Sequence, residues 1–265
     1  MLRSLVAVLM VLVPLAARAQ GAQQTLVDRA TLAVQEIVNN NPAGGDARSL
    51  LRRARGAMIC PRVFKAGFFF GGQGGGCVLV GRGAVGWSPP AFYDMGSGSF
   101  GLQAGIQDSQ ILLIVLTERG LRALLDSQFK IGGDASLAFA TVGIGVQGAT
   151  TAAFDADIVA YQNNRGLFAG ISLEGSLLSS DSASNAAYYG QPLASQQIVL
   201  QGTGSNAGAD PLREVLTRYS GPAAPAPAAR PYASLPPPQP AAGPLPITPP
   251  PATGTVQTTP LAPLH

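Results

Sequence analysis

The distribution of glycine is the feature that most restricts the fold of this chain. Residues 71–76 read Gly-Gly-Gln-Gly-Gly-Gly. An apolar run lies on each side of them, Phe68-Phe69-Phe70 before and Cys77-Val78-Leu79-Val80 after. Two apolar runs around a glycine cluster are typical of strand, tight turn and strand. A dinucleotide-binding loop is disfavoured, because it must open a helix, and residues 77–80 indicate a strand.

Further hairpins are expected along the chain. One spans Gly98 to Leu116, with alternating residues before a buried-strand run from Ile111 to Leu116. Another β region covers Leu137 to Val146. The last covers Phe154 to Tyr161 and Gly166 to Leu178, with Asn163-Asn164 as its turn.

Four segments of the chain have the residue spacing or the capping residues of a helix. The first helix has an apolar face of five residues at three-to-four spacing: Leu26, Ala30, Ala33, Val34 and Ile37. A second helix is expected from the N-cap Asp46 through Met58, ending at Pro61. Thr117 can cap a short inserted helix, and Asp210-Pro211 opens a last one that runs to about Tyr219.

Strands outnumber helices and do not alternate with them regularly. This pattern predicts an α+β fold, with an antiparallel curved sheet or small barrel of β-hairpins, two N-terminal helices and a short inserted helix. Abundant glycine suits the tight bends and bulges of such a sheet.

The two ends of the chain differ from its centre. Residues 1–19 have a charged start, an apolar run from Leu5 to Leu15 and the small-x-small triplet Ala17-Arg18-Ala19. They predict a signal peptide cleaved after Ala19, and thus a periplasmic or cell-surface protein. A retained anchor is the alternative, although the run is shorter than the roughly 20 residues that span a bilayer.

Residues 220–265 contain 15 of the 22 prolines and one charged side chain, Arg230. Such a segment buries too little apolar surface to offset its ordering entropy, so we expect a disordered proline-rich tail. It acts as a spacer or, alternatively, as a ligand for a proline-binding protein. The globular domain is therefore expected at residues 20–219.

The net charge of +3 does not indicate a nucleic-acid partner. Of the 17 basic residues, Arg3, Arg18 and Arg230 lie in the two end segments, so 14 remain in the domain. They face 14 acidic residues, and the domain is neutral. Any attraction to anions must come from local clustering.

The two cysteines, Cys60 and Cys77, leave two alternatives open. Export permits a disulfide between them. Their apolar, glycine-rich surroundings equally suit two buried thiols.

The usual catalytic constellations are missing from the sequence. The one histidine, His265, ends the tail, which excludes Ser-His-Asp and Cys-His systems within one chain. Two cysteines without another histidine do not make a zinc site, and no P-loop motif occurs. Asp155 and Asp157 would share one face of a strand, where solvation is favoured over an acid–base pair. We expect no enzyme activity, no metal and no cofactor.

One cluster of basic residues stands out: Arg48, Arg52, Arg53, Arg55, Arg62 and Lys65. On the expected second helix, Arg48, Arg52 and Arg55 would form one basic stripe at i, i+4 and i+7. A basic amphipathic helix followed by Phe64 and residues 68–70 suits anionic lipid headgroups. The alternative is a solvated outer face of a packed helix.

Several ordered segments of the chain resemble the SYLF domain, also called the Ysc84 actin-binding domain. They are AMICPRVFKAGF (57–68), GGQG (71–74), GWS (86–88), PAFY (90–93), GSFGLQAG (98–105), ALL (123–125) and RGLFAGISLEG (165–175). The resemblance covers about residues 25–190. Cys60 and Cys77 depart from it, since plain apolar or small residues are expected there.

The resemblance implies binding of phosphoinositides and related anionic phospholipids through a basic surface. Eukaryotic members also bind actin, but a signal peptide makes actin an implausible partner for this chain. The expected function is therefore phospholipid binding at the basic residues without catalysis. The alternative is a structural or protein-interaction module of the cell envelope without a lipid ligand.

Overall fold

The computed structural model describes residues 2–40, 44–68, 70–100, 105–126, 128–130, 137–141, 156–166 and 176–221. The helices are α1 (Leu2–Asn40), α2 (Gly44–Arg53), α3 (Glu118–Leu125), α5 (Ser182–Tyr189), α6 (Ser195–Gln201), the 3-10 turn η1 (Ala207–Ala209) and α7 (Asp210–Ser220). The strands are β1 (Gly56–Gly67), β2 (Phe70–Gly83), β3 (Gly86–Trp87), β4 (Ala91–Phe100), β5 (Gly105–Val115), β6 (Gln128–Lys130), β7 (Leu137–Thr141), β8 (Ile158–Gly166) and β9 (Leu177–Ser180).

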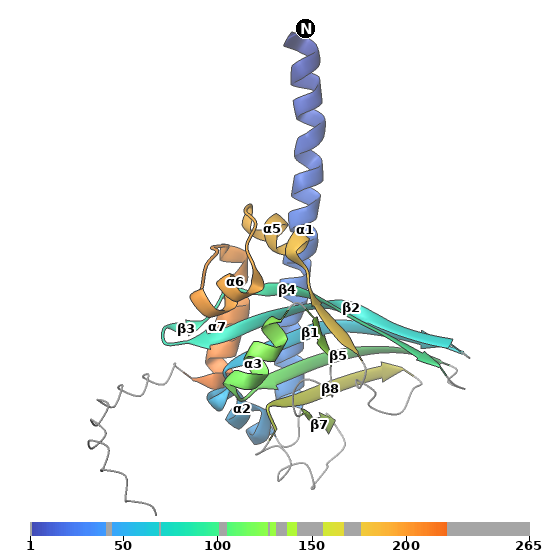
Figure 1. The fold of residues 1–265 in the computed structure, drawn as a ribbon, viewed down its shortest axis with the longest axis vertical. Coiled ribbons are helices and arrows are strands. Elements are labelled where there is room, and N and C mark those ends of the chain that lie inside the picture. The colour runs from blue at the N-terminus through green and yellow to red at the C-terminus, as the bar shows by residue number, and fades with distance from the viewer. Residues whose placement is uncertain are drawn as a thin grey trace, which may run out of the picture. The chain divides into compact units, whose positions relative to one another are not determined.

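All the strands of the described residues belong to one curled sheet, with β1 and β2 at its centre (Figure 1). The order is β6-β9-β4-β2-β1-β5-β8-β7, and β3 pairs with the end of β2. Every described pair is antiparallel except β7 with β8, which is parallel. The predicted α+β fold with a curved antiparallel sheet is confirmed.

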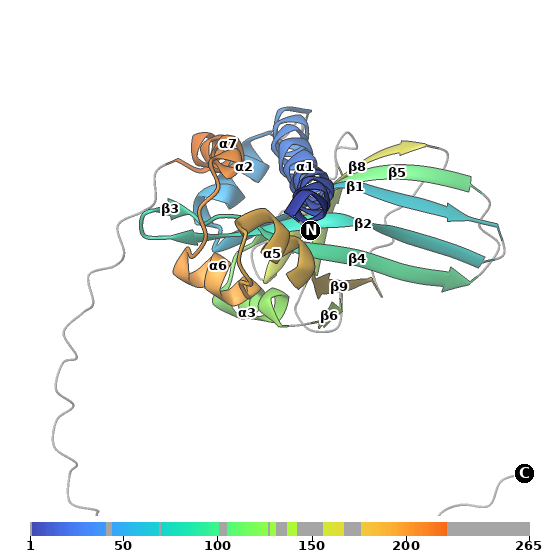
Figure 2. The ribbon, with the colours of Figure 1, turned by 90° about the horizontal axis from the view of Figure 1, so that it is seen from above.

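Both faces of the central part of the sheet are buried, which explains why its central strands read as continuous apolar runs. Alternate residues of β1 enter different cores: Ala57 and Ile59 face one side, Met58 and Cys60 the other. Helices α1, α2 and α7 cover the first face, and α3 and α6 cover the second (Figure 2).

The first predicted helix is confirmed as part of α1. Its buried stripe consists of Val27, Ala30, Ala33, Val34, Ile37 and Val38, all fully inaccessible to solvent. Leu26 lies at the margin of that stripe and is half-buried. This apolar face anchors α1 across the centre of the sheet.

The glycine cluster is not a turn, and that prediction was wrong. Residues 71–76 lie inside β2. Strand β1 ends at Gly67 and β2 begins at Phe70, and the Phe68 N–H donates to the Phe70 carbonyl. A Cβ at Gly75 would lie 2.1 Å from the Arg62 carbonyl oxygen, and a Cβ at Gly76 would lie 3.0 Å from Leu26. Glycine is used here because backbone and helix approach the strand closely.

The second helix is shorter than predicted. It begins at Gly44 and ends at Arg53, and residues 56–58 already belong to β1. The backbone of Arg55 explains the switch, because its N–H donates to Val115 and its carbonyl accepts from Arg82. Pairing with neighbouring strands on both sides thus overrides the helical periodicity. Pro61 falls instead at a bulge of β1, where a missing N–H is tolerated.

Asn163 and Asn164 do not form a turn either. Both lie within β8, opposite Gln110 and Ser109 of β5. The Asn163 side-chain amide nitrogen donates to the side-chain oxygen Oε1 of Gln110 at 3.0 Å. Cross-strand pairing with a long neighbour therefore outweighs the local turn preference of the Asn-Asn pair.

The inserted helix is confirmed in detail. Thr117 accepts a hydrogen bond from the Gly120 N–H through its hydroxyl, and α3 buries Leu121, Leu124 and Leu125. The last predicted helix is confirmed as α7, with Pro211 in its first turn. Helix α5 was not predicted, although Asp181 caps it at the Ser184 N–H and Gly190 ends it at φ 67°.

Candidate functional site

The predicted basic residues separate into two groups. Arg48, Arg52 and Arg53 are exposed on α2. Arg48 donates to the Asn39 side chain at 3.2 Å and lies 5.2 Å from the centre of the Tyr219 ring. One group therefore stands on α2, beside α7.

The other group follows β1 away from α2. Arg55 precedes the strand and pairs with Glu118 at 3.5 Å. Arg62 pairs with Asp108 at 2.7 Å, and Lys65 lies opposite Gln73 and Gln107. The eleven residues from Arg55 to Lys65 span roughly 30 Å of strand. The predicted stripe of Arg48, Arg52 and Arg55 is wrong, because Arg55 is not helical.

Arg82 of β2 joins the ends of α2 and α7. Its guanidinium donates to the carbonyls of Leu51 and Arg52 at 2.9 and 2.8 Å, and to that of Gly221 at 3.0 Å. It also lies 5.7 Å from the centre of the Trp87 ring. Burial lowers the pKa of Arg82. A cation at two helix C-termini satisfies carbonyls that lack intrahelical partners.

We call this part of the surface the basic end and define it as Arg48, Arg52 and Arg53 of α2 with Arg218 of α7. Arg218 is exposed in the last turn of α7, and α7 packs against α2. The one carboxylate of α7 beyond its first turn is Glu214. Four arginines on two neighbouring helices therefore give a local excess of positive charge in a domain of zero net charge.

A groove runs between α1 and the sheet. Its polar part, about 570 Å³, has two arginines, two carboxylates and several amides on its walls, among them Arg29, Glu36, Arg62 and Asp108. Its apolar part, about 490 Å³, is lined by Leu26, Phe64 and residues 74–76. Arg29, Pro61 and Arg62 border both parts, so the groove changes from polar to apolar along its length.

Cys60 and Cys77 form a disulfide between β1 and β2, with their Cα atoms 4.1 Å apart. Both cysteines are inaccessible to solvent and pack in the core on the second face of the sheet. Of the two alternatives left open by the sequence, the structure has the disulfide.

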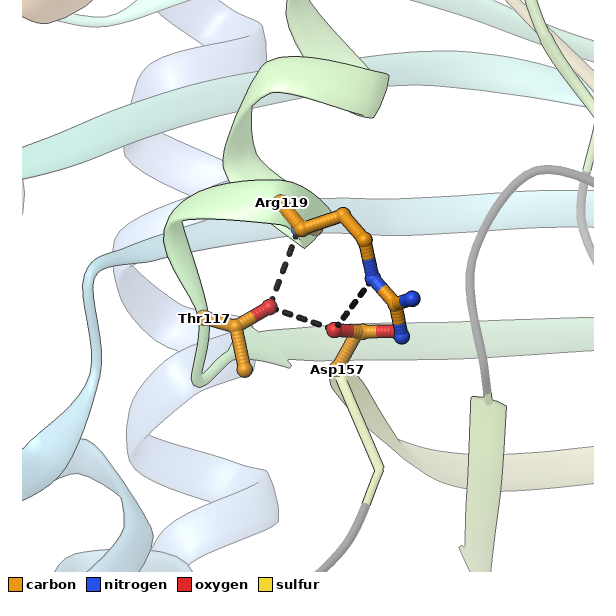
Figure 3. Close-up of polar contacts among 4 residues, drawn as sticks. Thr117, Arg119 and Asp157 are labelled. Carbon is orange, nitrogen blue, oxygen red and sulfur yellow. Dashed lines mark hydrogen bonds and ion pairs between the residues drawn. The ribbon is translucent and has the colours of Figure 1, made fainter. Parts of the chain in front are cut away.

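Asp157 is held by structural contacts (Figure 3). The Thr117 hydroxyl donates to its Oδ1 at 2.6 Å, and Arg119 donates to both of its carboxylate oxygens. Its side chain is only 4% exposed. Asp155, its predicted neighbour, lies outside the described residues. The contacts of Asp157 tie β8 to the start of α3 and account for its burial.

Among the residues that the structure describes, no group of three or more histidine, cysteine, aspartate and glutamate side chains is placed to hold a metal ion. No helix in that part of the chain is long and apolar enough to cross a membrane. Residues 222–265 of the expected tail lie outside the described residues.

Known proteins place the chain in a family. Residues 96–219 match the family model "Ysc84: Las17-binding protein actin regulator". The chain is 31% identical over 171 residues to Protein YSC84 of Saccharomyces cerevisiae, covering 63% of this chain and 36% of that protein. It is 30% identical over 173 residues to the human SH3 domain-containing YSC84-like protein 1, covering 64% of this chain and 50% of that protein.

The family model is described as a Las17-binding protein and actin regulator, and the chain spans half or less of the length of these two relatives. The match agrees with the resemblance seen in the ordered sequence segments. The chain belongs, through this domain, to the Ysc84 or SYLF family.

Proposed function

We propose that this domain binds the surface of anionic phospholipid membranes through its basic end and catalyses no reaction. The observation that carries the proposal is the exposure of Arg48, Arg52 and Arg53 together on α2, beside Arg218 of α7. Arginine binds phosphate oxygens with two parallel hydrogen bonds, so it suits lipid phosphates better than a point charge does.

The expected strength is modest. Each basic residue close to an anionic membrane surface contributes about 1 kcal/mol. Four such residues would together contribute roughly 4 kcal/mol to membrane binding. Salt should weaken this binding strongly, because exposed charges are screened over about 10 Å at moderate ionic strength. A domain held in this way would associate reversibly with the membrane.

Co-sedimentation with vesicles tests the proposal. Wild-type protein should pellet with vesicles of phosphatidylcholine mixed with phosphatidylglycerol, less so as salt rises, and not with phosphatidylcholine alone. The double variant Arg52→Glu/Arg53→Glu should lose most of this binding. Circular dichroism and thermal unfolding show whether it remains folded.

The matched control is Arg122→Glu/Lys130→Glu, which makes the same change of charge at exposed positions of α3 and β6. It should bind nearly as well as wild type. Equal loss in both double variants would mean that total charge, not the basic end, governs binding. If the α2 variant binds as wild type does, the basic end is not the binding surface.

The names of the relatives support a second candidate, a protein-interaction module. The family model is described as a Las17-binding actin regulator, and yeast relatives are named LAS seventeen-binding protein 3. A chain with this function would show no vesicle binding at low salt and would co-sediment with actin filaments or bind a Las17-type protein. The same purified protein can be used for both assays.

Export belongs to the proposal as well. The apolar run before Ala19 supports cleavage after that residue and a periplasmic or cell-surface location. N-terminal sequencing of the protein from its native cells tests this directly, because a mature protein that begins before Gln20 would contradict the cleavage site.

A further inference from the structure

The hairpin of β1 and β2 ends in exposed apolar side chains. Phe64 is 44% exposed, Phe68 is 63% exposed and Phe70 is 76% exposed. Ile106, at the start of β5, is 61% exposed. We call these four side chains the strand tip.

The register of the sheet gathers the strand tip into one patch. Ala66 lies opposite Ile106 on β5 and opposite Gly72 on β2. Because alternate residues share a face, Phe64, Phe70 and Ile106 project from the same face as Ala66. Phe68 stands at the reversal of the hairpin itself. The patch is thus built from the β1–β2 hairpin and from β5. The hairpin expected over Gly98 to Leu116 is not formed, because β4 pairs with β2 and β9 whereas β5 pairs with β1 and β8.

The position of the strand tip explains its exposure. The strands β1, β2, β4 and β5 extend past the helices that cover the centre of the sheet (Figure 2). Elsewhere on the described strands, Phe92, Tyr93 and Phe129 are almost fully buried. Single exposed apolar residues are common on protein surfaces, but several large ones that adjoin one another mark an interaction site.

Cationic groups lie directly behind the strand tip. Phe64 lines the apolar part of the groove together with Arg29 and Arg62, and that part has no carboxylate on its walls. Arg29 is exposed on α1. Arg62 also pairs with Asp108 at 2.7 Å. From the end of the sheet inward, the surface is therefore first apolar and then carries Arg29 and the ion pair of Arg62 with Asp108.

We propose that the strand tip inserts into the outer acyl region of a phospholipid bilayer, while Arg29 and Arg62 lie at the level of the lipid phosphates. The order of apolar and cationic groups matches the order of acyl chains and phosphates in a bilayer, which is the charge complementarity that favours this occupant. Insertion of this kind reaches about 5–10 Å into the boundary of the bilayer.

This inference rests on the proposed membrane function but assigns a different surface to it. The basic end and the strand tip lie at opposite ends of β1. Binding at the basic end is electrostatic and sensitive to salt. Insertion of the strand tip depends on apolar area and resists salt. The two contributions can therefore be measured separately.

Tryptophan fluorescence gives the direct test. Phe68→Trp places a reporter at the strand tip. Leu200→Trp places a matched reporter on α6, on the face of the sheet opposite α2 and α7, where Leu200 is 55% exposed. The natural Trp87 is 3% exposed and gives the same background in both variants. Each variant is mixed with phosphatidylcholine–phosphatidylglycerol vesicles whose acyl chains carry bromine, which quenches tryptophan only on contact.

We expect quenching and a blue shift for Phe68→Trp and no change for Leu200→Trp. In a second experiment, Phe68→Asp and Phe70→Asp should each lower vesicle binding at high salt by roughly tenfold, since each removes one large apolar side chain that insertion would bury in the bilayer. Leu200→Asp should leave binding unchanged. All of these positions are exposed, so the variants should fold.

The failures are distinguishable. If wild-type protein binds no vesicles at any salt concentration, the membrane function itself is wrong. If wild-type protein binds vesicles but the fluorescence of Phe68→Trp is not quenched, the proposed insertion of the strand tip is wrong. The proposed membrane binding through the basic end then still stands. If the strand-tip variants instead lose a dimer detected by light scattering, the patch joins two copies of the chain, which would also overturn the proposal.

Discussion

Arg119 holds the carboxylate of Asp157 from outside the core. Its Nε and Nη2 atoms donate to the two oxygens of a side chain that is 4% exposed, while the Arg119 side chain itself is 72% exposed. The charge of this buried carboxylate is therefore balanced by an arginine whose side chain is mostly exposed to solvent. Gly120 completes the contact, because a Cβ there would lie 3.1 Å from the Asp157 carbonyl oxygen.

Replacing Asp157 should be costly. Asp157→Ala leaves Arg119 and the Thr117 hydroxyl without their acceptor and should lower the free energy of unfolding by about 3 kcal/mol. Asp108→Asn removes a pair whose side chains are 59% and 40% exposed, and should cost less than about 1 kcal/mol. Urea unfolding of both variants measures the difference; equal losses would contradict a special role for the buried carboxylate.

Gly75 should not tolerate a side chain. Gly75→Ala would place a Cβ 2.1 Å from the Arg62 carbonyl oxygen, so β1 and β2 would have to separate at the bulge. We expect a loss of more than about 2 kcal/mol. Gly96→Ala is the control, because nothing lies within 4 Å of its Cβ. Thermal unfolding should show a large drop for the first variant and little change for the second.

The disulfide should stabilise the hairpin by restricting the unfolded chain. The bond closes a loop with a sequence separation of 17 residues. Cys60→Ala/Cys77→Ala should lower the free energy of unfolding by roughly 3 kcal/mol in the chain-entropy description. Reductant should lower the melting temperature of wild type to a similar extent and leave that of the variant unchanged, whereas a reductant effect on the variant would point to another cause.

Alkaline pH should destabilise the domain through its buried tyrosines. Burial raises the pKa of Tyr93 and Tyr188 to about 12. The unfolded chain loses these protons near pH 10, so between about pH 10 and 12 the folded state holds more protons. Stability is then fully present below pH 10 and falls as pH rises. Tyrosinate absorbance and circular dichroism recorded together should show these residues ionising as the fold is lost.

Arg82 should control the attachment of α2 and α7. Arg82→Lys keeps the charge but removes the planar set of donors that reaches carbonyls of both helices. We expect a loss of about 2 kcal/mol and weaker vesicle binding, because the basic end is no longer held together. If Arg82→Lys is as stable as wild type, a positive charge at this position is enough to hold α2 and α7 in place, and the planar set of donors is not needed.

Much of the fold could be predicted from local pattern. Residue spacing and residue type predict three features that form as expected. They are the buried stripe from Ala30 to Ile37, the cap at Thr117 and the apolar runs of β2 and β5. The candidate site was predicted less well. The sequence indicated arginines and phenylalanines on one continuous surface, but α2 and the strand tip lie at opposite ends of β1.

By itself, the sequence determined which residues are apolar, where α3 and α7 begin and the class of the fold, because spacing and capping act over a few residues. Only the tertiary structure decided that residues 71–76 are strand, that Arg62 meets Asp108 46 residues away, and that Asp157 is buried under Arg119. Those outcomes depend on strand register and close backbone approach. Both arise between segments that are distant in the chain, so no local pattern contains them.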